Sequence, residues 1–104
     1  MQTRTELQPK SPAAKANYQF DFTDQLASGE TISTQTVVAS LYSGVDADPS
    51  RLIAGAASQS SGIVTQAIKE GLAGNIYQLT CTVTTSGNLT LQRSGLLAIV
   101  EGAQ

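Results

Sequence analysis

The stretch YQLTCTVT, residues 77–84, decides the fold, because its apolar and polar residues alternate without a break. The odd-numbered positions are apolar and would point to one side of a β-strand, while the even-numbered positions are polar and would point to the other. Such a strand covers a core on one face and meets solvent on the other. The next residues, TSGN at 85–88, predict a hairpin turn in which Gly and Asn supply positive φ angles.

The sequence on either side of this strand extends the β pattern. LAGNIY, residues 72–77, resembles a tyrosine corner, in which a Leu and a tight turn lead into the penultimate strand and the Tyr hydroxyl bonds back to the backbone. The alternative is that Tyr77 is an ordinary core residue. A last strand is expected from Leu89 to Val100, and a change of phase at residues 94–95 predicts a bulge within it.

The first half of the chain supplies further strands. Aromatic residues alternate with polar ones at 18–22, and residues 30–43 form a long run rich in Thr, Val and Ile. Residues 51–57 are interpreted as a strand, and residues 63–69 as either a strand or a short helix. Six or seven short strands separated by turns predict an all-β fold, an immunoglobulin-like two-sheet β-sandwich. Its dry interior is expected around Phe20, Tyr77 and Leu79.

The chain is expected to divide into three parts. Residues 1–16 lack periodicity and form an extended N-terminal arm, residues 17–101 form the sandwich, and residues 102–104 are a short tail. The arm is interpreted as a segment that becomes ordered on a partner, with a frayed terminus as the alternative. Its candidate partner-contact residues are Arg4, Leu7 and Lys10.

Composition excludes several classes of protein. The chain has 104 residues, which suits one domain, and only 13% of them are charged. Its net charge is −2 and its six basic residues are scattered, so we expect no nucleic-acid partner. The single cysteine excludes an intrachain disulfide. We find neither a signal peptide nor an apolar run long enough to span a membrane, so synthesis in a cytoplasm and no membrane partner are expected.

The sequence also lacks the residues for most enzymatic chemistry. It has no histidine, which removes the commonest general base and metal ligand. Cys81 occupies an inward strand position, where a cysteine behaves as a small hydrophobe. The acidic pairs at positions 21 and 24 and at 46 and 48 are interpreted as turn formers, with a weak metal-site alternative at the second pair. We therefore expect a protein that is not an enzyme, with no catalytic residue, metal or cofactor.

Three segments together resemble a family of small phage virion-associated proteins. YQFDFTDQLASGETI at 18–32 is similar to the family's opening strand and its Leu-x-x-Gly-Asp-Thr-Ile turn, and GNIY at 74–77 and VTTSGN at 83–88 agree with its second half. The resemblance covers residues 10–100. The chain departs from the family pattern in three places, which weakens any inference about a shared contact surface: Gln25 where many members have Trp, Glu30 where Asp is common, and Asn88 where Arg often follows the glycine.

The resemblance implies a virion component with an immunoglobulin-like domain, in a group described variously as fibre, head-decoration or head–tail region proteins. Our main hypothesis is a phage virion structural protein, made in the host cytoplasm, that serves as a tile or adaptor on the capsid or the head–tail neck region. It would bind capsid, neck or tail subunits as a symmetric homo-oligomer. The alternative is a host-surface adhesion module of a tail or head fibre, with Tyr42 as the candidate aromatic contact.

Overall fold

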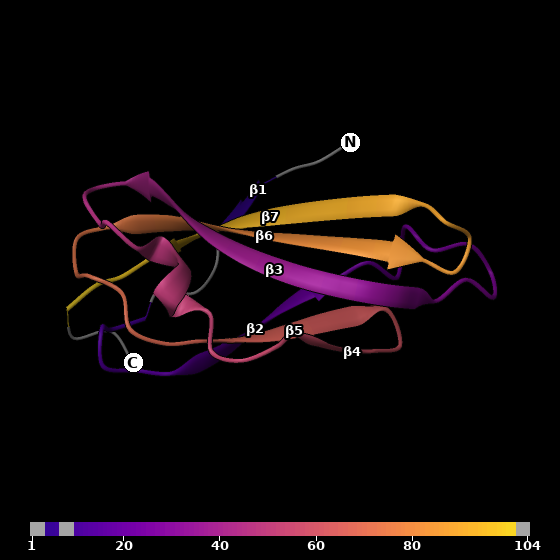
Figure 1. Ribbon diagram of the computed structural model, residues 1–104, viewed down its shortest axis with the longest axis horizontal. Helices are drawn as coiled ribbons and strands as arrows, with labels where there is room; N and C mark the ends of the chain where they lie inside the picture. The colour runs from indigo at the N-terminus through magenta and orange to yellow at the C-terminus, as the bar shows by residue number, and fades with distance from the viewer. Residues whose placement is uncertain (1–3, 7–9, 102–104) are drawn as a thin grey trace.

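The computed structural model describes residues 4–6 and 10–101, and these fold into two packed β-sheets (Figure 1). The elements are β1 (Arg4–Glu6), β2 (Ala16–Asp21), β3 (Ile32–Ser43), the 3-10 helix η1 (Pro49–Leu52), β4 (Ser58–Ser60), β5 (Ile63–Ile68), β6 (Ile76–Thr85) and β7 (Thr90–Ala98). One sheet has the strand order β1-β7-β6-β3 and the other β2-β5-β4. Neighbouring strands are antiparallel except β1 and β7, which are parallel. The predicted all-β sandwich of six to seven strands is confirmed.

β6 lies inside the four-stranded sheet and its side chains alternate as the sequence predicts. Every odd-numbered residue from Tyr77 to Thr85 is buried, and the even-numbered residues between them are partly exposed. β6 pairs with β3 along one side and with β7 along the other. Because both sides of β6 are paired, its apolar face forms the middle of the core.

The hairpin predicted between β6 and β7 is confirmed, with one correction. Asn88 has a φ of 66°, in the left-handed region, but Gly87 does not adopt positive φ. A Cβ at Gly87 would lie 2.6 Å from Oε2 of Glu30. Glycine therefore serves here to make room for the Glu30 carboxylate.

The bulge predicted in β7 at Ser94 and Gly95 is wrong, because both residues face β6 with no shift in register. The apolar alternation breaks in the sequence because inward positions of β7 hold Arg93 and Gly95. The Arg93 guanidinium lies over the Phe22 ring, 5.9 Å from its centroid, and donates a hydrogen bond to Oδ1 of Asp24 at 3.0 Å. Its stem can thus cover the end of the core while the charge stays near solvent.

Two predictions concern the middle of the chain, residues 51–57 and 63–69. Ile63–Ile68 is strand β5, with alternate residues buried, and not a helix. The strand predicted at residues 51–57 is wrong, since residues 49–52 form η1 and only one isolated bridge to β5 follows. Pro49 stands in the first turn of η1, where its fixed φ favours a helical start. Leu52 is fully buried and holds the helix against the core.

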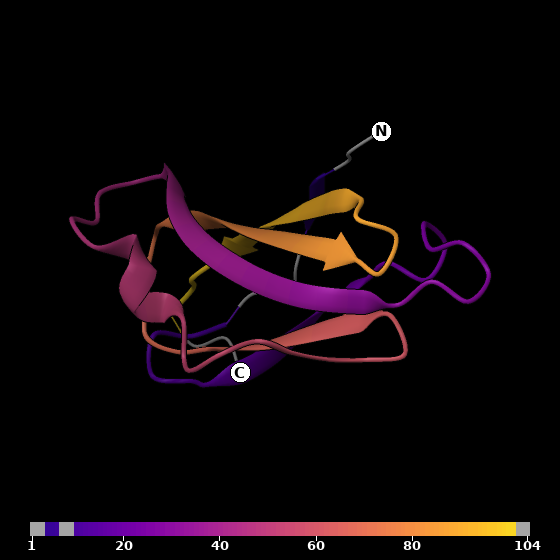
Figure 2. The same ribbon diagram turned by 45° about the vertical axis from the view of Figure 1, so that its right-hand side comes forward.

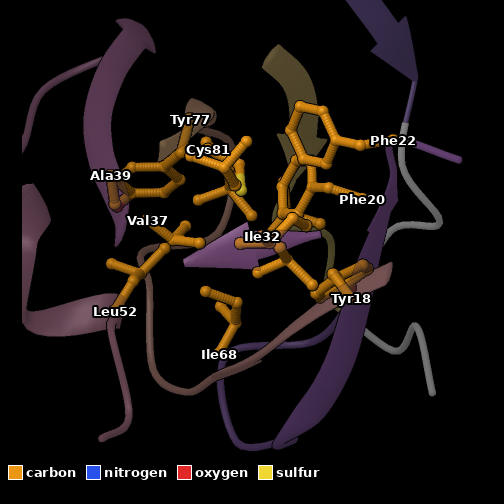
Figure 3. Close-up of a cluster of buried hydrophobic side chains, with 14 of the residues drawn as sticks. Tyr18, Phe20, Phe22, Ile32, Val37, Ala39, Leu52, Ile68, Tyr77 and Cys81 are labelled. Carbon is orange, nitrogen blue, oxygen red and sulfur yellow. The ribbon is translucent and has the colours of Figure 1, made fainter. Parts of the chain in front are cut away.

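The core fills the space between the two sheets (Figure 3). Phe20, Tyr77 and Leu79, around which the sequence places the interior, are 4%, 0% and 0% exposed. The aromatic alternation of β2 is confirmed, because Tyr18 and Phe20 are buried and Phe22 follows them into the core. The other buried apolar residues are Ile32, Val37, Ala39, Leu52, Val64, Ile68, Cys81, Val83, Leu97 and Ile99.

The described part of residues 1–16 lies against the sandwich. β1 pairs with β7, with Arg4 opposite Ser94 and Glu6 opposite Leu96. Lys10 forms a further bridge to Ile99. These residues extend the four-stranded sheet at its β7 edge, while the ordering of the arm on a partner and the boundaries of the three predicted parts stay predictions.

Candidate interaction surface

Cys81 is placed for packing. Its thiol is buried on the inner face of β6, as predicted, and burial raises its pKa to about 12. A thiol of this kind is neutral and a poor nucleophile at physiological pH. Among residues 4–6 and 10–101, no group of three or more His, Cys, Asp or Glu is arranged to hold a metal ion. The same residues contain no helix that is long and apolar enough to cross a membrane.

The acidic pair Asp46 and Asp48 shapes the loop between β3 and η1. Oδ1 of Asp46 accepts hydrogen bonds from Nη1 of Arg51 at 2.6 Å and from the Asp48 N–H at 3.0 Å. Oδ1 of Asp48 accepts one from the Ser50 hydroxyl at 2.6 Å. The Arg51 guanidinium, with the Tyr77 hydroxyl and the Asp48 N–H, lowers the pKa of Asp46 to about 2. These contacts form and fix a turn, as the sequence predicts.

Tyr77 forms the predicted tyrosine corner. Its hydroxyl accepts a hydrogen bond from the Leu72 backbone N–H at 3.1 Å, and another from Nδ2 of Asn75 at 3.2 Å. The same hydroxyl donates to Oδ2 of Asp46 at 2.6 Å. Nδ2 of Asn75 also donates to the Val45 carbonyl at 2.9 Å. The network satisfies these polar groups internally and joins the start of β6 to the loop after β3.

β3, β6 and β7 of the four-stranded sheet together form a broad outer face with a uniform composition. Residues directly opposite each other in β3, β6 and β7 share a face, so the register defines its members. None of them is charged, and hydroxyl or amide side chains dominate. We call this surface the Thr-rich face; it comprises Thr34, Thr36, Val38, Ser40, Ser43, Ile76, Gln78, Thr80, Thr82, Thr84, Thr90, Gln92, Ser94, Leu96 and Ala98.

Among residues 10–101, charged side chains lie instead toward the two ends of the strands, while Arg4 and Glu6 of β1 stand opposite Ser94 and Leu96 at the β7 margin of the Thr-rich face. Figure 2 shows the loop of residues 22–31 projecting at one end, and the loop of residues 44–48 with η1 at the other. The first end carries three carboxylates and one guanidinium, and the second carries cations and carboxylates together. The members are Asp21, Asp24, Glu30 and Arg93 at the first end, and Lys10, Lys15, Asp46, Asp48, Arg51, Lys69, Glu70 and Glu101 at the second.

The structure separates the four predicted partner-contact residues. Tyr42 is 49% exposed at the end of β3, at one margin of the Thr-rich face. Arg4 lies in β1 opposite Ser94, so its register position adjoins the opposite margin of that face. Leu7 is outside the described residues. Partner contact by Arg4, Leu7 and Tyr42 stays a prediction.

Lys10 is only 1% exposed in the described structure, and its predicted contact with a partner is also not tested by the fold. Its ammonium donates to the carbonyls of Ser11 and Ala14, both at 2.8 Å, and of Glu70 at 2.6 Å. Burial lowers the pKa of Lys10, and the charge of Glu70 opposes that effect. Lys10 therefore fastens the N-terminal segment to the segment after β5.

The free edge of β3 is a feature that the sequence analysis missed. β3 ends the strand order of its sheet, so one side of its backbone has no neighbouring strand in that sheet. Its position depends on the order of strands, which local alternation does not reveal. The available signal was the complete lack of charged residues and proline in Ile32–Ser43, which is unusual for an edge strand.

The described residues thus form a two-sheet β-sandwich in which β3, β6 and β7 together present one uncharged outer face. Residues 10–98 of the chain match the family described as podophage GP4 fiber-tail adaptor protein gp77, and the chain belongs to that family. It is a family of phage structural adaptors, which agrees with a virion structural protein and is not a class of enzymes. No curated protein matches the chain closely enough to serve as a relative.

Proposed function

We propose that this protein is a virion adaptor that binds other virion proteins where a fibre meets the tail, and that the Thr-rich face is its main contact surface. The junction is taken from the description of the family that the chain matches over residues 10–98. The observation that carries the proposed contact surface is that β3, β6 and β7 contribute only uncharged residues to one broad face. A partner that covers this face does not need to desolvate any charge on these three strands.

Several hydroxyl and amide groups of this face already bond to one another or to the backbone of the sheet. The Thr36 hydroxyl donates to the Thr82 carbonyl at 3.4 Å, and Nε2 of Gln92 donates to the Thr82 hydroxyl at 3.0 Å. The Thr80 and Ser94 hydroxyls lie 3.4 Å apart and share a hydrogen bond. Polar groups with partners inside the face lose less when water is removed than groups bonded only to water. Such a face can therefore be buried against a second protein at low cost.

The shape of the molecule suits a spacer between two larger components. Its extents are 43 × 22 × 20 Å, and the long strands run along the long axis (Figure 1). We propose that the sandwich is of immunoglobulin type. The two sheets β2-β5-β4 and β7-β6-β3, and the tyrosine corner at the start of β6, support this assignment. A rigid body of this kind would hold its two partners in a fixed relative position.

The alternative, adhesion to a host surface, receives less support. An adhesive tip would be expected to present several aromatic side chains to a ligand. The chain has five aromatic residues, of which Tyr18, Phe20, Phe22 and Tyr77 are buried. Tyr42 alone is exposed among them. The geometry therefore favours attachment to virion proteins.

A matched pair of substitutions tests the proposed face. Gln92→Arg puts a charge on the Thr-rich face, and Gln19→Arg puts the same charge on the outer face of the other sheet, where Gln19 is also exposed in mid-strand. Each variant would be supplied to phage that lack the wild-type gene. We expect Q19R virions to carry the protein and their fibres, and Q92R virions to lose both, as measured by mass spectrometry and electron microscopy of purified particles. Normal incorporation of Q92R would overturn the proposed face.

A further inference from the structure

β3 lacks the features that normally keep an edge strand from pairing with another strand. It is the longest strand at 12 residues, it lies at the edge of its sheet, and it contains neither charge nor proline. Edge strands of soluble proteins are normally protected by lysines, prolines, bulges or shortness. The register irregularities of β3 lie between Ile32 and Thr34 and between Leu41 and Ser43. The stretch from Thr34 to Leu41 is therefore regular and lacks these protections.

The hydrogen bonds of β3 to β6 show which backbone groups face outward. The Thr36 and Ser40 hydroxyls reach the carbonyls of Thr82 and Gln78, the residues directly opposite them. Those carbonyls consequently point toward β3, which makes the even-numbered residues of β3 the ones that bond to β6. The N–H and C=O groups of the odd-numbered residues 35–41 then point to the free edge.

The middle of this edge is open in the described structure. In Figures 1 and 2 no other ribbon passes in front of the central part of β3. η1 and the short strand β4 both come close to β3. Leu52 of η1 is buried in the core, and Nε2 of Gln35, an inward residue of β3, bonds to the carbonyl of Ala57, which precedes β4. These contacts lie on the inner side of β3. A further strand can therefore be added in the plane of the sheet.

We propose that the edge of β3 pairs antiparallel with β3 of a second copy of this chain, about a twofold axis at Val38. In this register Val38 lies opposite Val38 of the other copy, and Val37 lies opposite Ala39 of the other copy. The outward-pointing groups of residues 35–41 would form up to about eight backbone hydrogen bonds between the copies. The pairing would join the two Thr-rich faces into one continuous surface. Only the role of that joined surface in the virion rests on the proposed function; the pairing itself does not.

A second copy fits this edge better than an unrelated strand for two reasons. A twofold interface brings the same residues together from both sides, so any charge on β3 would oppose its own copy, and β3 has none. Val38 is 59% exposed although it is apolar, and it lies near the centre of the regular stretch. At the axis, two Val38 side chains would cover each other. In this register Thr36 also faces Ser40, a compatible polar pair.

Disulfide trapping tests the register directly. Residues opposite each other in a pair without mutual hydrogen bonds have Cβ atoms close enough for a disulfide, so Val38→Cys should yield a covalent dimer on mild oxidation. Val45→Cys is the matched control, because Val45 is 83% exposed in a loop away from the edge. The native Cys81 is buried and does not compete. We expect the cross-linked fraction of V38C to exceed that of V45C at least about tenfold.

A second variant keeps the test independent of the disulfide. Light scattering with size exclusion should show a concentration-dependent dimer for the wild type, and Val38→Lys should raise its dissociation constant at least about tenfold, because lysine blocks edge pairing. The proposal is overturned if the wild type stays monomeric up to about 1 mM, or if V38K dimerises like the wild type. Q92R should dimerise normally. The dimerisation measurements therefore test the β3 pairing, whereas the incorporation of Q92R into virions tests the Thr-rich face.

Discussion

The Tyr77 hydroxyl donates a hydrogen bond to Oδ2 of Asp46 at 2.6 Å, which joins the start of β6 to the loop that follows β3. The two residues are 31 positions apart in the sequence. The Asp46 side chain is only 3% exposed, and Arg51 binds its other oxygen at 2.6 Å. The tyrosine corner is therefore extended into a network that connects the corner to η1, and this end of the sandwich depends on it.

Tyr77→Phe should destabilise the protein without changing its fold. The substitution keeps the buried ring and removes the hydroxyl that serves Leu72, Asn75 and Asp46. We expect the free energy of unfolding to fall by roughly 1–3 kcal/mol, because buried groups lose their partners. Urea denaturation measures the change, and the m-value should stay constant. Thr90→Val, which removes a hydroxyl at an exposed position, is the control, and an equal loss in both variants would argue against the network.

The stability of the protein should fall in acid partly through Asp46. Its pKa is lowered from 3.8 to about 2 in the folded chain, with the hydrogen bond from Arg51 as the largest cause. Because the folded pKa is below the unfolded one, this carboxylate stabilises the fold above about pH 4 and loses that effect as the pH falls to about 2. Urea midpoints measured at a series of pH values should show a shallower acid loss in Asp46→Asn.

Asp46→Asn should still lose some stability in acid, because the pKa values of Asp21 and Glu30 are also lowered by hydrogen bonds. Asp48→Asn removes a charge from the same loop and is the matched control. An acid profile of D46N that coincides with that of the wild type would show that the Asp46 network does not govern this pH range.

Local alternation made β2 and β6 predictable from the sequence. Residues 77–84 and 18–22 have a period of two, and this period is a property of extended backbone whatever the rest of the chain does. The tyrosine corner was also accessible, because its Leu, turn and Tyr are close together at 72–77. These segments place the core and the start of β6 correctly.

The features that the sequence did not reveal depend on distant partners. Lys10 is charged and near the N-terminus, and its burial follows only from carbonyls that include that of Glu70, 60 residues away. The inward position of Arg93 depends on Phe22 and Asp24. The edge position of β3 depends on the strand order. Each of these requires the assembled sheets, so a local pattern does not contain it.

Cys81 should report global unfolding when the native protein meets a thiol reagent. Its thiol is buried and its pKa is raised to about 12, so iodoacetamide should not alkylate the folded protein. Labelling should then proceed through the unfolded fraction, which Tyr77→Phe increases. A loss of 1–3 kcal/mol corresponds to labelling that is roughly 5- to 150-fold faster, which mass spectrometry can follow. Rapid alkylation in native buffer, equal in both proteins, would show that the thiol is accessible.

Lys10→Met should test whether the buried ammonium fastens the N-terminal segment. Methionine retains an apolar side chain of similar length but leaves the carbonyls of Ser11, Ala14 and Glu70 without their donor. Since hydrogen bonds to a charged donor contribute more than neutral ones, we expect the free energy of unfolding to fall by roughly 1.5–3 kcal/mol. Lys15→Met, at an exposed position, should change it by less than about 0.5 kcal/mol. Hydrogen exchange should also be faster in K10M for the Lys10 and Val100 amides, which bond to Ala98 and to Lys10 respectively. If K10M were as stable as K15M, with unchanged exchange at these amides, the ammonium would be dispensable and backbone pairing with β7 and Ile99 would hold the segment.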